Sequence, residues 1–471
     1  MKKLIILFLF CSFEVFGNNL PELGSSFDSL ISNVDEKKIK FQIMSQIYKS
    51  NSIIRDPEIN DYLNNLGNEL ISKGTVKKPE VNFFIINDSS INAFAMLGNI
   101  IGVHSGLLYA AKSESELASV ISHEIAHITQ KHLLRLIDTQ SKNSYKSYLA
   151  LAVALLVARS SPQLANAALT TGSASQIQNT LDYTRDNERE ADRIGLKILN
   201  DSGYDPRGFI DFFNTMQKFN NFSSGAAPAF LRTHPVTTER ISDIQDRIDD
   251  YSYLQINSTI EFFLVKAKLQ ALLGEYSSVV DIFKNDLNME TYLNKSATYF
   301  GLIYALMRQN KTDEAIKYFE QLKSMNIQSP MILELNAQIL IKQNKLQEAF
   351  DIYKQGINKY PLNRTFVYGI SKLLLGSMNF DKAIELLSSY LVYYKNDPYI
   401  YELLAKAYNQ KGDKLREHEN LSDFFYYQFN IKDAISQMDL AVRQNSDDHY
   451  EQSRVEYRIK ELQREEMLMN N

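Results

Sequence analysis

Cysteine is almost absent from this 471-residue chain. Its one thiol, Cys11, lies in the opening sequence MKKLIILFLFCSFEVFGNN, where two lysines precede a short apolar stretch and a Val-Phe-Gly sequence. This order is typical of a secretory signal peptide, and we expect cleavage near Gly17, so that residues 1–17 are removed. The exported chain would then contain no thiol, which excludes disulfides, thiolate ligands and cysteine catalysis.

Long apolar runs are also lacking after the leader. The nearest is YLALAVALLVA, residues 148–158, which is shorter than the roughly 20 residues that a membrane helix needs. We therefore expect no transmembrane helix in the exported chain. Basic residues do not predominate either, because 51 Lys and Arg face 56 Asp and Glu. A net charge of −5 gives no electrostatic basis for binding nucleic acid.

The second half of the chain carries a repeat of 34 residues. Ala315, Ala349 and Ala383 follow one another at this spacing, and a further step reaches Glu417, where the small residue is lost. A second series with the same spacing comprises Ala337, Ser371 and Ala405. Small residues at this period indicate tetratricopeptide helical hairpins, although the consensus Trp is missing throughout. An all-α tetratricopeptide solenoid over 257–465 is the prediction, with an unrelated helical bundle as the alternative; such arrays bind other proteins on their concave face.

The first half, residues 18–250, predicts an α+β domain that is mostly helical with a small sheet. The sequence VNFFIINDSSINAFAMLGNIIGVHSGLL, residues 81–108, is rich in β-branched and aromatic residues and contains turn sequences, which indicates two or three short strands. Ser113 and Glu116 then stand at capping-box spacing before apolar residues at helical intervals. We expect a helix here.

Histidine is scarce, yet three of the seven lie in SHEIAHITQKH, residues 122–132. On a helix, His123 and His127 project from one face and can bind one cation, while Glu124 can reach a water on that cation. Two neutral histidines of this kind hold zinc, which lowers the pKa of its water toward about 7 so that a Glu can take the proton. The alternative is a pair of ordinary histidines on a helix surface.

A third ligand is expected because catalytic zinc usually has three protein ligands and one open position. In DYTRDNEREADRIGLKIL, Glu188 and Asp192 fall on the same helical stripe as apolar residues, where buried carboxylates are costly unless paired or metal-bound. We predict Glu188 as the third ligand and Asp192 as the acceptor for the free N–H of a ligating histidine. A salt bridge of Glu188 with a neighbouring arginine is the alternative, and Glu190 is predicted to be solvated surface.

The paired sequences HEIAH at 123–127 and EREAD at 188–192 resemble those of the zinc metallopeptidases that include HtpX-like and CAAX prenyl proteases. With a signal peptide and trailing repeats, the whole chain is similar to the members of this group that act in the periplasm of Gram-negative bacteria on assembly of outer-membrane β-barrels. The resemblance implies one zinc ion per chain, with His123, His127 and Glu188 as ligands, Glu124 as general base and Asp192 behind the ligands. It also implies misassembled outer-membrane proteins as substrates and the β-barrel assembly machinery as a partner of the repeats.

Two further features bear on the reaction. An edge strand can hold an extended substrate through backbone hydrogen bonds, and Asn92, Ala93, Phe94 and Ala95 are our candidates; a plain core strand is the alternative. His234, in THPVTTERI, is a candidate fourth ligand or oxyanion donor, with Pro235 and Arg240 ordering its loop; a histidine that caps a helix is the alternative. His132 is predicted to be structural, and His104 is left open.

The segment from 148 to 180 joins an apolar part to one rich in Ala, Ser and Thr. This composition fits a lid over the cleft or a peripheral contact with a membrane, or else a buried helix with a loop. The sequence thus predicts a periplasmic zinc endopeptidase. A tetratricopeptide chaperone or scaffold with a latent or inactive metal site is the alternative.

Overall fold

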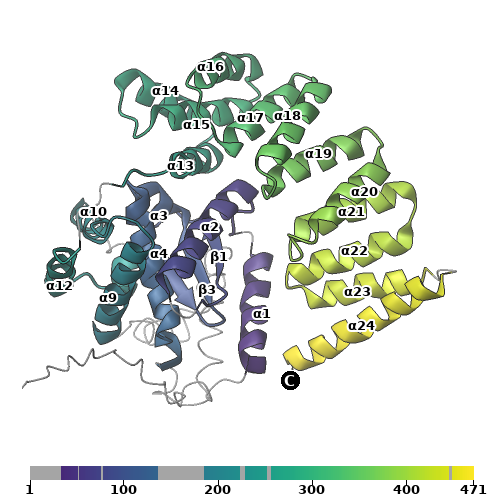
Figure 1. Ribbon diagram of the computed structural model, residues 1–471, viewed down its shortest axis with the longest axis horizontal. Coiled ribbons are helices and arrows are strands. Elements are labelled where there is room, and N and C mark those ends of the chain that lie inside the picture. Colours follow the sequence, from purple (N-terminus) through teal and green to yellow (C-terminus); the bar gives the residue numbers. More distant parts are fainter. Residues whose placement is uncertain are drawn as a thin grey trace, which may run out of the picture.

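The computed structural model describes residues 33–50, 52–75, 78–135, 185–222, 229–251, 256–444 and 448–470. The expected signal peptide and the 148–180 segment lie outside these ranges. A helical domain with a small sheet is followed by a long arc of paired helices (Figure 1). No helix in the described ranges combines the length and the apolar character needed to cross a bilayer.

The sheet has three strands in the order β1-β3-β2, with β1 at Asn82–Ile86, β2 at Ala93–Met96 and β3 at Ile100–His104. β1 runs parallel to the central β3, and β2 runs antiparallel to it with Phe94 opposite Gly102. Gly98 and Asn99 take left-handed backbone angles between β2 and β3, as a tight turn requires. The short strands expected in 81–108 are confirmed, and β2 is an edge of the sheet.

Helix α4 (Glu114–Thr129) is the centre of this domain and is buried along most of its length. Ser113 caps its N-terminus by accepting a hydrogen bond from the Glu116 N–H, and Glu116 accepts one in return from the Lys112 N–H, which confirms the helix start read from the sequence. The helix packs against α2, α9, α10 and β2. Gly195 of α9 lets the two backbones approach closely, since a Cβ atom there would lie only 3.0 Å from the His123 Cα atom.

The other helices of the first domain surround this core. Their bounds are α1 (Asn33–Lys49), α2 (Pro57–Gly74), α3 (Ser105–Ala110), α9 (Arg185–Asp201), α10 (Gly208–Phe222), α11 (Ala229–Thr233) and α12 (Thr238–Ile248). Aliphatic residues of α2 and α4 and phenylalanines of α10 form one continuous apolar cluster with the sheet. The mixed helical and sheet character predicted for the first half is thereby confirmed.

The arc consists of successive helix pairs. They are α13 (Ile260–Leu273) with α14 (Val279–Met289), α15 (Lys295–Arg308) with α16 (Thr312–Ser324), α17 (Pro330–Lys342) with α18 (Leu346–Lys359), α19 (Arg364–Gly376) with α20 (Phe380–Tyr390), α21 (Pro398–Lys411) with α22 (Lys414–Tyr427), and α23 (Ile431–Val442) with α24 (His449–Asn470). Both series of small residues are buried at the helix crossings. The predicted solenoid is confirmed.

The 34-residue period is also present in the backbone. Asn310, Asn344, Met378 and Gly412 all take left-handed angles, and each ends the first helix of a pair. The turn therefore persists at the fourth step, although Glu417 replaces the small residue there. Turn geometry, rather than the identity of the small residue, maintains the register of the weakest repeat.

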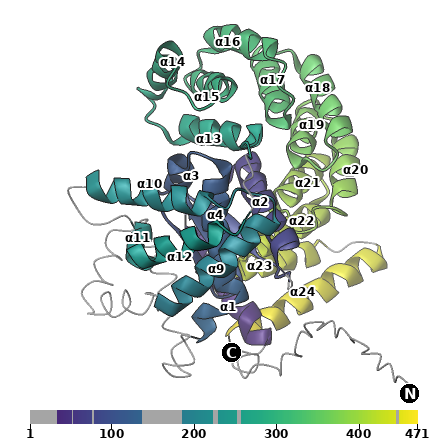
Figure 2. The same ribbon diagram turned by 60° about the vertical axis from the view of Figure 1, so that its left-hand side comes forward.

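The solenoid curves back onto the first domain (Figure 2). Helix α13 packs on α2 and α3, α19 contacts α2, and α24 contacts α1. Arg364 of α19 forms an ion pair with Asp61 of α2, and Phe429 lies against Phe41 and Tyr48 of α1. The two regions consequently meet at both ends of the arc and enclose space between them.

Candidate metal centre

Helix α4 supplies the first three side chains of the site. His123 and His127 lie one turn apart on the same face, with their ring centroids 4.7 Å apart and their Nε2 atoms 3.0 Å apart. Both side chains are buried, although histidine as a residue type is only intermediate in its tendency to be buried. Glu124 follows His123 and is buried as well. The helix start set by Ser113 thus fixes where these three residues project.

Two residues from distant segments complete the cluster. Glu188 of α9 has Oε1 at 3.4 Å from His127 Nε2 and Oε2 at 3.5 Å from His123 Nε2. His234, which follows α11, has Nδ1 at 3.0 Å from Glu188 Oε1 and at 3.4 Å from His123 Nε2. The ligating atoms of these four side chains all lie within 4.8 Å of one another. The structure thus brings Glu188 and His234 together with both histidines of α4.

These distances fit a tetrahedral metal site. Bonds of 2.0–2.1 Å from a zinc ion to nitrogen and oxygen place neighbouring ligand atoms about 3.3 Å apart. The separations given above run from 3.0 to 3.5 Å, with Glu188 Oε1 facing His127 and His234 and Oε2 facing His123, and one ligand atom from each residue gives a set within 4.8 Å. Three nitrogens and one carboxylate oxygen form a donor set that suits zinc and other borderline divalent cations. The residues therefore fit the cofactor that the sequence predicted.

Each histidine of α4 is held from behind through its other ring nitrogen. His123 Nδ1 lies 3.0 Å from Asp192 Oδ1, and Arg240 donates to both Asp192 oxygens at 2.6 and 2.7 Å. Arg240 also donates to the Pro235 carbonyl at 2.8 Å and lies 2.8 Å from Glu188 Oε2. Arg240 thereby connects the His234 loop to Glu188 and Asp192 of α9.

The second histidine is held by a different set. His132 Nδ1 lies 2.8 Å from His127 Nδ1, and His132 Nε2 lies 3.2 Å from Glu190 Oε2, which accepts from Arg135 at 2.8 Å. The prediction of solvated surface for Glu190 is wrong, because its side chain is only 28% exposed and is paired with two partners. His132 is buried as a structural residue would be, but its partner is a candidate ligand.

Glu124 lies beside the cluster with its carboxylate unengaged. Neither of its oxygens has a hydrogen-bond partner in the described parts of the chain, and Oε1 lies 3.5 Å from His234 Nε2. Burial raises the pKa of Glu124, and the neighbouring charges of His234 and His123 oppose this shift only in part. A carboxylate held ready in this way can accept a proton from a group placed against it.

The electrostatics of the cluster call for a cation. Although burial opposes it, Asp192 and Glu188 raise the pKa of His123 to about 10. Burial lowers the pKa of His127 well below its usual range. Burial would raise the pKa of Glu188, but His234 and the hydrogen bonds from the histidines hold it well below the ordinary value. Without a metal, the site thus retains a proton on one imidazole, and a divalent cation would take its place.

Strand β2 passes next to this cluster, since α4 packs against it. His104 N–H donates to the Asn92 carbonyl at 3.0 Å, so alternate residues of the strand bond to β3 while Ala93 and Ala95 direct their N–H and C=O groups away from it. Phe94 packs against Phe84 of β1 across Gly102 of the central strand, on one face of the same sheet. The predicted substrate strand is thus an edge strand beside Glu124, with Asn92 just before its first residue.

His104 belongs to a separate local network. Its Nδ1 atom lies 2.8 Å from Ser90 Oγ and 3.3 Å from Asp88 Oδ2. Burial lowers the pKa of His104 to about 4, so the ring is neutral at physiological pH. It fixes the loop before β2 and is not part of the metal-ligating cluster.

The comparisons with known proteins agree with this geometry. Residues 57–248 match the model of peptidase family M48, and residues 340–407 match a tetratricopeptide repeat model. A β-barrel assembly-enhancing protease of Escherichia coli is 31% identical over 449 residues, which cover 94% of this chain and 91% of that protein. The chain belongs to the β-barrel assembly-enhancing protease family. It is a metallopeptidase with trailing repeats, as its sequence resemblance predicted.

Two further relatives match different lengths of this chain. A β-barrel assembly-enhancing protease of Yersinia pestis is 28% identical over 446 residues, or 94% of this chain and 92% of that protein. The metalloprotease YcaL of Escherichia coli is 28% identical over 174 residues, or 36% of this chain and 62% of that protein. The β-barrel assembly-enhancing proteases therefore share the combination of peptidase domain and repeats, whereas the YcaL match covers about a third of the chain.

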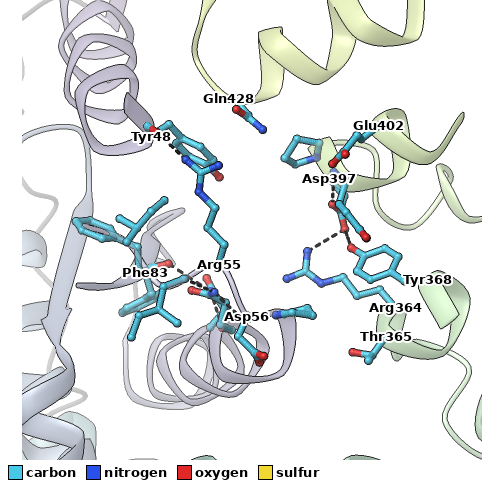
Figure 3. A pocket seen from close by; sticks show the side chains of 18 of the residues that line it. Tyr48, Arg55, Asp56, Phe83, Arg364, Thr365, Tyr368, Asp397, Glu402 and Gln428 are labelled. Carbon is cyan, nitrogen blue, oxygen red and sulfur yellow. Dashed lines mark hydrogen bonds and ion pairs between the residues drawn. The ribbon is translucent and has the colours of Figure 1, made fainter. Parts of the chain in front are cut away.

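Sequence reasoning missed the partners behind His127 and the cavity between the two regions. The cavity has a volume of about 710 Å³. Tyr48, Arg55 and Phe83 lie on its peptidase side, opposite Arg364 and Asp397 of the repeats (Figure 3). No local signal in the sequence predicts such a cavity, because its walls come from segments that are some 300 residues apart.

Proposed function

We propose that this protein is a zinc-dependent endopeptidase of the bacterial periplasm with one zinc ion per chain. The observation that carries the proposal is the convergence of His123, His127 and Glu188 to metal-ligand distances beside the unengaged carboxylate of Glu124. In the proposed assignment the three are zinc ligands, Glu124 is the general base, and Asp192 holds the His123 ring. Zinc is the ion that two histidines in the H-E-x-x-H arrangement typically hold, and imidazole and carboxylate donors suit it.

The chemistry follows from the placement of Glu124. A bound zinc ion would supply an acidified water and would polarise the scissile carbonyl. Glu124 accepts the proton of the attacking water and then delivers it to the leaving amine. Its raised pKa suits the first half of this transfer, because a more basic carboxylate takes the proton of the water more readily. Arg240 and Asp192 keep the His123 ring in place throughout.

The substrate is proposed to lie along β2. The backbone groups of Ala93 and Ala95 that face away from β3 offer hydrogen bonds to an extended chain whatever its side chains. The Ala95 N–H lies next to the Glu124 carboxylate, so a strand added here would place a peptide bond close to the general base. Asn92 and Phe94 would flank it. This geometry suits an endopeptidase with broad sequence tolerance.

His234 is proposed to occupy the fourth ligand position at rest. Its Nδ1 atom lies as close to Glu188 and His123 as the other donors do, and the Phe230 ring stacks on it at 4.8 Å. A site with four protein ligands has no position for water, whereas a catalytic site keeps one open. His234 must therefore leave the ligand position before the reaction. This observation favours a latent resting enzyme over an inactive scaffold.

The repeats and the cavity are proposed to bind clients. The walls carry tyrosines and phenylalanines together with charges of both signs. Asn82 Nδ2 on the peptidase side and Thr365 Oγ1 on the repeat side are buried and have no hydrogen-bond partner in the described ranges. These groups suit an extended polypeptide. By likeness to the relatives, misassembled outer-membrane proteins are the proposed clients and the β-barrel assembly machinery a proposed partner; contact with a membrane surface through 148–180 stays a prediction.

The test combines activity with metal content. Wild-type protein should digest casein, lose this activity with a chelator and regain it with zinc. Glu124→Gln should lower the rate by about 10²–10⁴-fold with zinc still bound, because only the base is removed. His234→Ala should raise the rate, since a ligand position is opened. Full activity in Glu124→Gln would contradict the assignment, and client binding without cleavage by zinc-loaded His234→Ala would favour the scaffold.

A further inference from the structure

The chain reverses direction immediately after the metal-binding helix. Helix α4 ends at Thr129, and Lys131 takes a left-handed backbone angle of 54°. In a continuing helix, the residue five positions after His127 would be rotated away by about 140°. The reversal instead returns His132 to the His127 ring, where the two Nδ1 atoms lie 2.8 Å apart. A left-handed lysine is an uncommon conformation, and its effect here is to create this contact.

The hydrogen-bond directions in this contact are determined by the metal site. If His127 binds a cation through Nε2, the neutral ring carries its proton on Nδ1. His132 Nδ1 must then accept that proton's hydrogen bond, which places the His132 proton on Nε2. That nitrogen lies 3.2 Å from Glu190 Oε2, a carboxylate that only accepts. In the chain of contacts from His127 through His132 to Glu190, two neutral rings therefore have one consistent arrangement of protons. Glu190 determines this arrangement because it can only accept a hydrogen bond.

The far end of the path is itself anchored. Arg135 Nη2 donates to Glu190 Oε2 at 2.8 Å, so the carboxylate is held in position and kept ionised. His132 is fully buried, which shields its contacts with His127 and Glu190 from water. The arrangement matches the one behind His123, where Arg240 anchors Asp192. The difference is that a neutral imidazole stands between His127 and its carboxylate.

We propose that His132 and Glu190 are positioning residues that hold His127 in its metal-binding tautomer and orientation. The inference rests on the proposed function in one respect, namely that His127 is a metal ligand. Partners of this kind behind a ligand typically contribute 10–100-fold to metal affinity. The Glu190 carboxylate acts on His127 only through the His132 imidazole. Loss of the His132 acceptor should therefore weaken metal binding, although no metal ligand is removed.

Three variants test the proposal by zinc affinity, measured in competition with a chelator. His132→Leu removes the acceptor and should weaken zinc binding by about 10–100-fold. His132→Asn, whose side-chain oxygen can take the place of Nδ1, should bind zinc nearly as tightly as wild type. His104→Leu is the matched control, since it removes a buried histidine outside the cluster and should leave zinc affinity unchanged. Rescue by Asn separates positioning from a general loss of packing.

Nitrogen NMR of the zinc-loaded protein with labelled histidines provides a readout independent of activity. We expect an unprotonated Nδ1 and a protonated Nε2 in His132, and Glu190→Leu should disturb both signals while Glu190→Gln, which keeps an acceptor, should not. A proton on His132 Nδ1, or equal zinc affinity in His132→Leu and wild type, would overturn this inference alone. Failure of wild type to bind zinc would instead overturn the proposed function and this role with it.

Discussion

The peptidase domain and the solenoid differ in how far apart in the sequence their contacting residues lie. The metal-ligating cluster joins His123 to Glu188 and His234, which are 65 and 111 residues away. In the solenoid, each helix mainly contacts its immediate neighbours, and the same turn recurs every 34 residues. The comparison teaches that damage in the first region should disable the site as a unit, whereas damage in the second should remain local.

The largest expected effect is loss of the metal in Glu188→Ala. This change removes a ligand and leaves Arg240 without one of its two carboxylate partners. We expect zinc content to fall from one ion per chain to nearly none, as measured by mass spectrometry of the metal. Asp186→Ala is the control, because Asp186 lies on the same helix with its side chain 91% exposed. Retention of zinc by Glu188→Ala would mean that the distant segments do not act as one site.

The next largest effect is expected where the two regions meet. Arg364 pairs with Asp61 of the peptidase domain and with Asp397 of the repeats. Hydrogen bonds to charged groups contribute about 1.5–3 kcal/mol, so Arg364→Ala should lower the free energy of unfolding by that order. Arg443→Ala, which breaks an exposed pair within α23, should cost less than 1 kcal/mol. Urea unfolding compares the two; equal effects would show that the link between the regions is unimportant.

A smaller loss of stability should follow when a larger side chain is introduced at a buried position of one repeat. Ala383 is fully buried where α20 crosses α19, and a larger side chain there has to displace its neighbours. Ala383→Leu should destabilise the protein by about 1–3 kcal/mol. Hydrogen exchange should become faster in α19 and α20 and stay unchanged in α4 and α9. Lys382→Leu, at the exposed neighbouring position, is the control. Faster exchange in α4 would contradict the local behaviour expected of the repeats.

The last prediction concerns the pH dependence of stability at the boundary between the regions. Burial, with the nearby Glu58 charge, raises the pKa of Glu334 in α17 to about 8. The folded protein thus binds this proton more tightly than the unfolded chain, so the stabilisation is full below about pH 4.5 and is lost as pH rises through 8. Glu334→Gln should therefore be more stable than wild type at pH 8.5 and gain little at pH 5. Thermal unfolding at both values measures this; a gain independent of pH would contradict it.

The two regions also differ in what their sequences disclose. The solenoid was predictable because each repeat is a local helix pair that carries its small residue at the same position. The spacing of Ala315, Ala349 and Ala383 therefore places the helix pairs. Part of the cluster was predictable because some of its residues lie on the same helix. Helical periodicity alone places His123 and His127 on one face, and it places Glu188 and Asp192 on one face of a second helix. The edge position of β2 was anticipated as a candidate only.

What the sequence did not disclose depends on chain reversals and on contacts between regions. A helix that continued past Thr129 would turn His132 away from His127, but the left-handed Lys131 ends the helix. Glu190 lies off the buried stripe of α9 and pairs only because that reversal brings His132 and Arg135 to it. His234 had no spacing that tied it to the cluster. The cavity could not be foreseen, since its two walls are formed by separate domains.

The central claim is that two helices and one loop bind a single zinc ion. Anomalous diffraction from crystals of the zinc-loaded protein tests it most directly. A zinc peak should lie about 2.0–2.2 Å from His123 Nε2, His127 Nε2 and a Glu188 carboxylate oxygen, with His234 Nδ1 at the fourth position. A zinc peak elsewhere in the chain, or none near these side chains in zinc-saturated protein, would contradict the account.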